Sequence, residues 1–352
     1  MGKILIDQYI PCKSFLAAKE ICVAFSDFHI REYYFGGTQT IRASRYIRKV
    51  HNKTYSHYVL IRYTINFKGE FNLYGFVDEK SIKRHPELPS VIEACNKDDR
   101  WRIIGDYKKK DDWFDIYYYK DFEDFYNQKL VTLLNRVDMA CKVSFSCKYH
   151  TDFFQIYYEE CGQAYERGFI ANNDVTHGLS LLGISDVSGA LFEPMPIQAV
   201  WDWSQKYYYD KKSDWYSEAR AWTALSYVIN RNGCESLLYS IMGLEAVYTK
   251  ENKRIKEQLR QSVPKVIDYI SEDDINELYK LRSEFVHGDI AYPMYGENNH
   301  DYSKGRLITK AAVVLLETIR LLVQNKATKI RVENGNTAFI CDRTLSGDME
   351  NK

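Results

Sequence analysis

Hydrophobic and polar positions alternate along residues 57–67, where every second residue from Val59 to Phe67 is apolar. This two-residue period predicts a strand that is buried on one side. Lys68 and Gly69 give a turn signal and residues 71–77 predict a second strand, so we expect the two strands to form a hairpin. Further strands are expected at 4–6, 102–104, 113–119 and 153–158, and helices at 81–95 and 122–137, whereas 15–25 fits a helix or a strand.

From residue 196 onward the apolar period becomes that of helices, which are predicted at 197–206, 215–229, 235–248 and 304–326. A basic segment at 250–260 leads into a further helix, with a restart expected at Pro264. Residues 171–195 are rich in Asn, Gly, Ser and Asp, which places a domain boundary there. The expected fold class is α+β: a mixed α/β N-terminal domain at 1–195, an all-α bundle at 196–326, and a tail at 327–352 with a short hairpin around Asn334 and Gly335.

Charge and cysteine usage narrow the class of protein. The 48 lysines and arginines balance the 48 aspartates and glutamates, which argues against a generic nucleic-acid-coating protein but permits a local basic cleft. Eight scattered cysteines form no C-x2-C pair, so we expect reduced thiols, no metal site and a cytoplasmic location. The most apolar helix carries Lys310, Glu317 and Arg320, so we expect no membrane span. The 29 tyrosines fit either a sheet-rich core or a recognition surface.

One predicted helix, at 271–287, carries an unusual charge. Ser271 and Asp274 form a capping-box pattern at its start, and Gly288 is suited to end it. Ile275, Leu278, Tyr279, Phe285 and Val286 fall on one side at a helical period. Arg282 projects into the middle of that apolar stripe, which is costly unless the guanidinium has an anionic partner or lines a cleft. With His287 in the last turn, the helix ends in an R-x4-H pattern.

The preceding core-type helix carries a misplaced charge of opposite sign. Glu245 falls at the edge of its apolar side, and we expect Glu245 and Arg282 to face one another. Simpler readings stay open: Glu245 can reach solvent, Arg282 can be a structural ion-pair residue, and His287 can be a helix-end residue favoured by the dipole. The R-x4-H pattern is also short enough to arise by chance, and Arg45 with His51 fits a looser form of it.

The chain resembles the HEPN superfamily in two segments, GLEAVY at 243–248 and RSEFVHG at 282–288. It looks like the ApeA-like branch, found in bacterial phage-defence proteins, in which such a domain follows an N-terminal partner domain. The resemblance covers about residues 196–326 and implies a HEPN helical bundle. Many HEPN ribonucleases carry Asn, Asp or His directly after the motif arginine, whereas this chain has Ser283, which is also polar.

The resemblance implies a metal-independent endoribonuclease without cofactors, in which two copies bring two R-x4-H motifs into one cleft. Arg282 and His287 would be catalytic, with Glu245 and Ser283 in support. The expected products are a 2′,3′-cyclic phosphate and a 5′-hydroxyl, and the expected role is anti-phage defence by abortive infection. Lys253, Arg254, Lys256 and Arg260 follow Lys250 in the basic segment and would guide the RNA backbone, although a solvated helix face explains them equally well.

The expected partners are RNA and a second copy of the chain. Because an unregulated ribonuclease would harm its host, we expect the tyrosine-rich N-terminal domain to sense a trigger derived from the phage and to control the helical domain. The alternative is a non-catalytic HEPN module that dimerises, or binds RNA or nucleotides, within a sensor or adaptor protein. Metal-independent RNA cleavage that depends on both Arg282 and His287 separates the two.

Overall fold

The protein is a mixed α+β protein with a largely helical C-terminal region. Its structure is a computed structural model that describes residues 2–12, 14–29, 31–32, 35–45, 57–67, 69–72, 75–78, 106–109, 112–115, 131–145, 153–160, 163–169, 194–208, 217–229, 234–250, 253–289, 301–333 and 335–341. The chain forms two compact units: Met1–Asp138 with Thr151–Ala171, and Met139–His150 with Asn172–Lys352.

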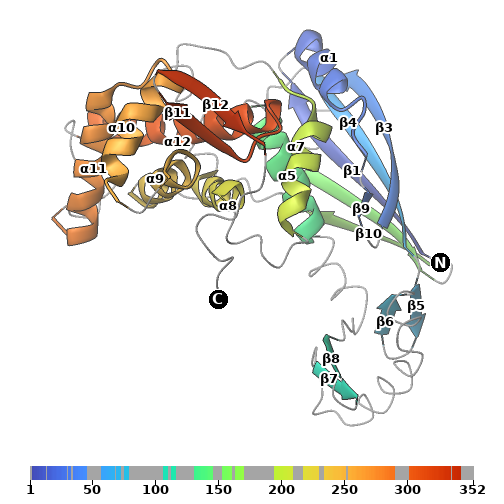
Figure 1. The fold of residues 1–352 in the computed structure, drawn as a ribbon. Helices are drawn as coiled ribbons and strands as arrows, with labels where there is room; N and C mark the ends of the chain where they lie inside the picture. Colours follow the sequence, from blue (N-terminus) through green and yellow to red (C-terminus); the bar gives the residue numbers. More distant parts are fainter. Residues whose placement is uncertain are drawn as a thin grey trace. The chain divides into compact units, whose positions relative to one another are not determined.

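The first unit contains an antiparallel sheet of six strands, covered by helix α1 (Phe15–Ala24) (Figure 1). The strands lie in the order β10 (Gln163–Phe169), β9 (Phe153–Glu160), β1 (Gly2–Cys12), β4 (His57–Phe67), β3 (Phe35–Arg45) and β2 (Arg31–Glu32). Ser14 caps α1, and Ile21 on that helix is fully buried together with Val59 and Ile61 of β4. The strand predicted at 57–67 is thus confirmed, with its alternation of burial seen from Val59 to Tyr63, and 15–25 is a helix for most of its length.

The predicted hairpin between 57–67 and 71–77 is wrong. Strand β4 is paired along both of its edges, to β1 on one side and β3 on the other, so no edge is left for the next segment. That segment instead pairs with itself, as β5 (Gly69–Asn72) against β6 (Gly75–Asp78). A further two-stranded sheet joins β7 (Asp106–Lys109) to β8 (Asp112–Asp115), which covers part of the predicted strand at 113–119.

The chain first passes from one unit to the other within helix α5 (Val131–Ser144), which the sequence did not predict. It passes to the second unit again after Ala171, at the start of the stretch 171–195 in which the boundary was predicted. The end of α5 belongs to the second unit because Arg320, which is 4% exposed, donates hydrogen bonds to the carbonyls of Val143 and Ser144 at 2.6 and 2.8 Å. These carbonyls have no partner inside α5, so the buried guanidinium satisfies them. The predicted segments at 81–95, 102–104 and 122–130, and most of 171–195, lie outside the described residues.

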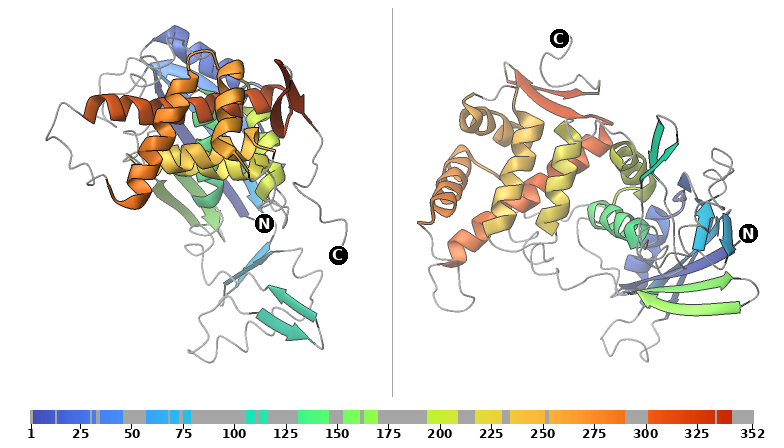
Figure 2. Two further views of the ribbon diagram at one scale, coloured as in Figure 1. Left: turned by 60° about the vertical axis from the view of Figure 1, so that its left-hand side comes forward. Right: turned by 90° about the horizontal axis from the view of Figure 1, so that it is seen from below.

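The second unit consists of α7 (Ile197–Tyr208), α8 (Ser217–Ile229), α9 (Cys234–Tyr248), α10 (Ile255–Val266), α11 (Glu272–His287) and α12 (Asp301–Gln324). These bounds agree with the predicted helices, except that α10 continues through Pro264 because that proline lies in the last turn, where it removes a single backbone hydrogen bond. Helices α8, α9 and α12 lie side by side (Figure 2). Among the helices that the structure describes, none is long and apolar enough to cross a membrane.

The tail is part of this second unit. Strand β11 (Lys329–Glu333) pairs with β12 (Asn336–Ile340), which confirms the predicted hairpin, and Gly335 takes a φ of 82° at the turn. The hairpin is anchored because Ile330 is fully buried and the Trp203 indole donates a hydrogen bond of 3.0 Å to the Ala327 carbonyl. The hairpin at 329–340 is therefore packed on the helical unit.

Gly243 allows the three helices α8, α9 and α12 to approach closely. A Cβ atom at this position would lie 2.7 Å from Leu315 Cδ1 and 3.1 Å from the Cβ of Ala224. Leu315 is fully buried and has little room to move. We expect Gly243→Ala to lower the free energy of unfolding by about 1–3 kcal/mol through overpacking.

Gly305→Ala is the matched control, because nothing lies within 4 Å of a Cβ atom there and Gly305 is also in a helix, α12. It should stabilise the protein by about 0.5–1 kcal/mol through the higher helix propensity of alanine. Urea unfolding of both variants measures the change in the free energy of unfolding, which should be negative for Gly243→Ala and positive for Gly305→Ala. A Gly243→Ala variant as stable as the wild type would show that α9 and α12 have room to separate.

Candidate functional site

Helix α11 carries the R-x4-H pattern and has well-defined ends. The Ser271 hydroxyl accepts a hydrogen bond from the Asp274 amide at 3.1 Å, and the Asp274 carboxylate accepts one from the Ser271 amide at 2.8 Å. Gly288 ends the helix with a φ of 76°. The predicted capping box and glycine C-cap are confirmed. Lys310 of α12 also contacts Asp274 at 2.6 Å, which fixes the start of α11 against α12.

The buried face of α11 is narrower than its apolar stripe. Ile275, Leu278 and Leu281 are buried, whereas Val286 is 60% exposed. The prediction that Val286 belongs to the buried face is therefore wrong, because Val286 projects about 140° around the helix from Leu281. Arg282 is half-buried at the edge of this face.

Tyr279 connects the two misplaced charges that the sequence singled out. Its hydroxyl donates a hydrogen bond of 2.7 Å to Glu245 Oε1 of α9. The Arg282 guanidinium lies over its ring, with Cζ at 5.7 Å from the ring centroid. Burial raises the pKa of Tyr279 well above its ordinary value, and the Glu245 carboxylate adds to this, so the hydroxyl keeps its proton. Glu245 and Arg282 therefore both contact Tyr279. The sequence predicted that they face one another directly.

Among the residues that the structure describes, the guanidinium of Arg282 has no ion-pair partner that would hold the fold together. Over the part of the chain that the structure describes, Arg282 makes no salt bridge, and its buried Nε atom has no hydrogen-bond partner. Burying a donor without a hydrogen-bond partner costs free energy. A hydrogen bond to a bound ligand would remove that cost. The terminal nitrogens of the guanidinium make no hydrogen bond or salt bridge to a described residue, so they, and not the enclosed Nε, are the donors available for an anion.

His287 and Ser283 are both exposed, and His287 is the last residue of α11. Arg282 and His287 project about 140° apart around one helix, so a single copy does not direct both at one phosphate. Ser283 lies one residue after Arg282, on a different side of the helix.

The basic segment is only partly available to a ligand. Lys253, Arg254 and Lys256 are exposed at the start of α10, and Arg254 takes a left-handed conformation with a φ of 52°. Arg260 contacts Glu257 at 2.9 Å and Glu272 at 3.6 Å, which neutralises much of its charge. Of the four predicted RNA-contacting residues, the first three keep an open cationic surface.

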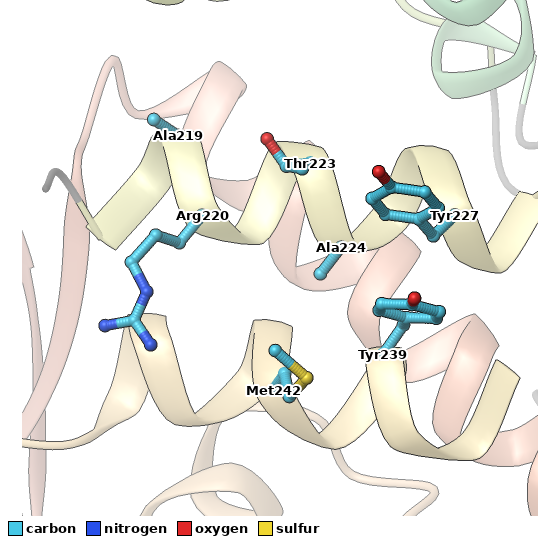
Figure 3. A pocket seen from close by; sticks show the side chains of 7 residues that line it. All are labelled: Ala219, Arg220, Thr223, Ala224, Tyr227, Tyr239 and Met242. Carbon is cyan, nitrogen blue, oxygen red and sulfur yellow. The ribbon is translucent and has the colours of Figure 1, made fainter. Parts of the chain in front are cut away.

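A groove that the sequence did not reveal lies between α8 and α9 (Figure 3). It has a volume of about 230 Å³ and is lined by two alanines of α8 together with Arg220, Thr223, Tyr227, Tyr239 and Met242. The rings of Tyr227 and Tyr239 stack with their centroids 4.6 Å apart. In the sequence these residues are ordinary positions of two amphipathic helices. Only the structure shows that Tyr227 and Met242 face outward, where they are 42% and 45% exposed.

The Tyr279–Glu245 hydrogen bond is testable by itself. Tyr279→Phe should lower the free energy of unfolding by about 1.5–3 kcal/mol, because the half-buried Glu245 carboxylate loses its donor. A double-mutant cycle with Glu245→Gln, measured by urea unfolding, isolates the pair. Additive effects of the two substitutions would show that the hydrogen bond contributes nothing of its own.

Within the described residues, no group of three or more His, Cys, Asp or Glu side chains is placed to hold a metal ion. Comparison with known protein families, curated proteins and solved structures gave no match to this chain. A function for the chain therefore rests on Arg282, its neighbours Tyr279 and Glu245, and the exposed His287.

Proposed function

We propose that this chain is a metal-independent endoribonuclease whose C-terminal unit is a HEPN-type helical bundle. The observation that carries the proposal is the half-buried Arg282 guanidinium, which has an unpartnered Nε atom and no salt bridge among the described residues. It is held over Tyr279 near the end of a rigidly capped helix that terminates in an exposed histidine. An arginine with free donors and an exposed imidazole, contributed by two copies of the chain, are suited to a reaction at a phosphodiester.

Two copies of the chain are needed for this chemistry. One α11 directs Arg282 and His287 about 140° apart, whereas a two-fold axis beside the helix end brings two arginines and two histidines into one groove. Val286 supports this arrangement, because it is a large apolar side chain that is 60% exposed directly beside His287. An exposed apolar residue next to the site is suited to a self-complementary contact.

The reaction follows from the two side chains. The imidazole of one His287 accepts the proton of a ribose 2′-hydroxyl, because imidazole is the side chain best suited to proton transfer near neutrality. The 2′-oxygen forms a bond to the adjacent phosphorus, and the bond from phosphorus to the 5′-oxygen breaks. Arg282 stabilises the charge that grows on the phosphoryl oxygens. The second His287 or water protonates the leaving 5′-oxygen, which leaves a 2′,3′-cyclic phosphate and a 5′-hydroxyl.

The test is cleavage of end-labelled single-stranded RNA by the full chain in EDTA, with identification of both new ends. We expect a cyclic phosphate and a 5′-hydroxyl, and no cleavage where the nucleotide before the scissile phosphate lacks its 2′-hydroxyl. Cleavage that requires added metal, or that leaves a 3′-hydroxyl, would contradict the proposal. Binding of RNA without cleavage would indicate the alternative, a non-catalytic dimerising or RNA-binding module.

We also propose that the enzyme acts in the cytoplasm in anti-phage defence and that the N-terminal unit controls it. RNA would pass the exposed cations Lys253, Arg254 and Lys256 of α10. A phage-derived trigger at the N-terminal unit would release the activity, which requires a resting state that cuts slowly. Equal cleavage by the full chain with and without extract from infected cells would contradict this control.

A further inference from the structure

The groove between α8 and α9 lies outside the Arg282–His287 site, and its two ends differ in chemistry. Arg220 lies at one end, and the stacked Tyr227 and Tyr239 lie at the other, with Met242 between them (Figure 3). The wall of the groove between these ends consists of small side chains of α8, namely two alanines and Thr223. The opening is therefore narrow, largely apolar and cationic at one end only.

The cationic end extends beyond the groove itself. Lys329 of β11 lies close enough to Arg220, and also to Arg331 of β11 and Lys250 after α9, to interact electrostatically with each of them. Glu333 is the carboxylate of this cluster, and it contacts Lys250. Among the described residues, Arg220, Lys329 and Arg331 form no ion pair, and the buried Nε atom of Arg331 has no hydrogen-bond partner. Lys329 and the three cations that act on it outnumber their described carboxylate partner Glu333, and such an excess of positive charge favours the binding of an anion.

The pKa of Lys329 is consistent with this crowding. Burial lowers it first, and the charges of Arg331, Arg220 and Lys250 lower it further. A bound phosphate would relieve that repulsion.

The aromatic end presents flat apolar surface to solvent. The two tyrosine rings are stacked face to face, with an angle of 17° between their planes, so each ring has only its outer face left for a base. Tyr227 is 42% exposed and Met242 is 45% exposed. Stacking on such rings is the way in which proteins bind unpaired bases without regard to their sequence.

We propose that this groove binds a single-stranded segment of RNA, with a base against Tyr227 and Met242 and the phosphates at Arg220 and the β11 cations. The inference rests on the proposed ribonuclease function and adds a strand-binding site to it. The groove adjoins the α11 site across α9, because Met242 and Glu245 are three residues apart on one helix surface and Glu245 contacts Tyr279. A strand held in the groove therefore has a short route to Arg282.

The experiment measures binding of a fluorescein-labelled single-stranded RNA by anisotropy at several salt concentrations. It uses the full chain carrying Arg282→Ala and His287→Ala, so that cleavage does not interfere. In that background, Tyr227→Ala should raise Kd by about 5- to 100-fold, and Tyr227→Phe should leave it unchanged because the stacking ring is kept. Arg220→Ala should raise Kd and reduce the salt slope by about one.

Lys265→Ala is the matched control, since Lys265 is exposed on α10 and does not line the groove. A single-stranded DNA of the same sequence should compete for the groove, because stacking and phosphate contacts do not require the 2′-hydroxyl, whereas a duplex should compete poorly. A Tyr227→Ala variant that binds as the Lys265→Ala control does, or a duplex that binds as well as the single strand, would overturn the inference.

The outcomes for the groove and for the proposed function are separable. If RNA binds in a Tyr227-dependent way but the intact chain cuts no RNA, the groove stands and the ribonuclease proposal fails. If the chain cuts RNA but binding is indifferent to Tyr227 and Arg220, the ribonuclease proposal stands and the groove is not a strand site.

Discussion

Replacing Arg282 with alanine is expected to lower kcat for RNA cleavage by about 100- to 1,000-fold, the usual cost of removing a donor that stabilises transition-state charge. His287→Ala should lower kcat by about 100- to 10,000-fold, because the proton-transfer group is lost. Arg282→Lys keeps the charge but not the two parallel hydrogen bonds, so its rate should fall between those of the wild type and of Arg282→Ala. Single-turnover cleavage of end-labelled RNA by the full chain gives these rates.

The stability of the same variants separates catalysis from structure. Arg282 makes no salt bridge among the described residues, so Arg282→Ala should change the free energy of unfolding by no more than about 1 kcal/mol. A buried structural ion pair would instead cost about 3–5 kcal/mol when broken. Lys280→Ala is the matched control for cleavage, because Lys280 is exposed on α11 and projects about 160° away from Arg282. Full activity of the stable Arg282→Ala variant would remove Arg282 from the reaction.

Val286→Asp is expected to convert a dimer of the chain into monomers and to lower the cleavage rate at least about ten-fold at nanomolar protein. The two-fold axis that we propose would bring the two introduced carboxylates together in a contact that excludes water, where like charges repel strongly. Because Val286 is 60% exposed, the fold of each copy should be unaffected. Sedimentation velocity and cleavage, both measured over a range of protein concentrations, test the two effects together.

Val286→Leu serves as the control, since it keeps an apolar surface and should remain dimeric and active. A second measurement mixes the Arg282→Ala and His287→Ala variants, each of which is expected to cut at least about 100-fold more slowly alone. Their heterodimer has one Arg282 and one His287 in the active site that the two copies share, so the mixture should regain activity. A Val286→Asp chain that is monomeric and fully active would contradict a composite site.

Local sequence determined the ends of α11 and the C-terminal hairpin. The capping box of Ser271 and Asp274, the left-handed Gly288 and the turn at Gly335 each depend on hydrogen bonds and backbone angles within a few residues. Such features need no distant partner, so they can be read from the sequence. The helices of the second unit were also predictable, because each buries one apolar stripe that repeats at a helical period in the sequence.

Tertiary structure alone decided which surfaces meet. The strand at 57–67 was predictable, but its pairing with β1 and β3 in place of the next segment was not, because a strand offers the same hydrogen-bonding edges to any neighbour. The sequence placed Glu245 and Arg282 near one another, and the packing of α9 on α11 put Tyr279 between them. The groove of Tyr227, Tyr239 and Arg220 exists only where α8 and α9 meet, since neither helix forms it alone.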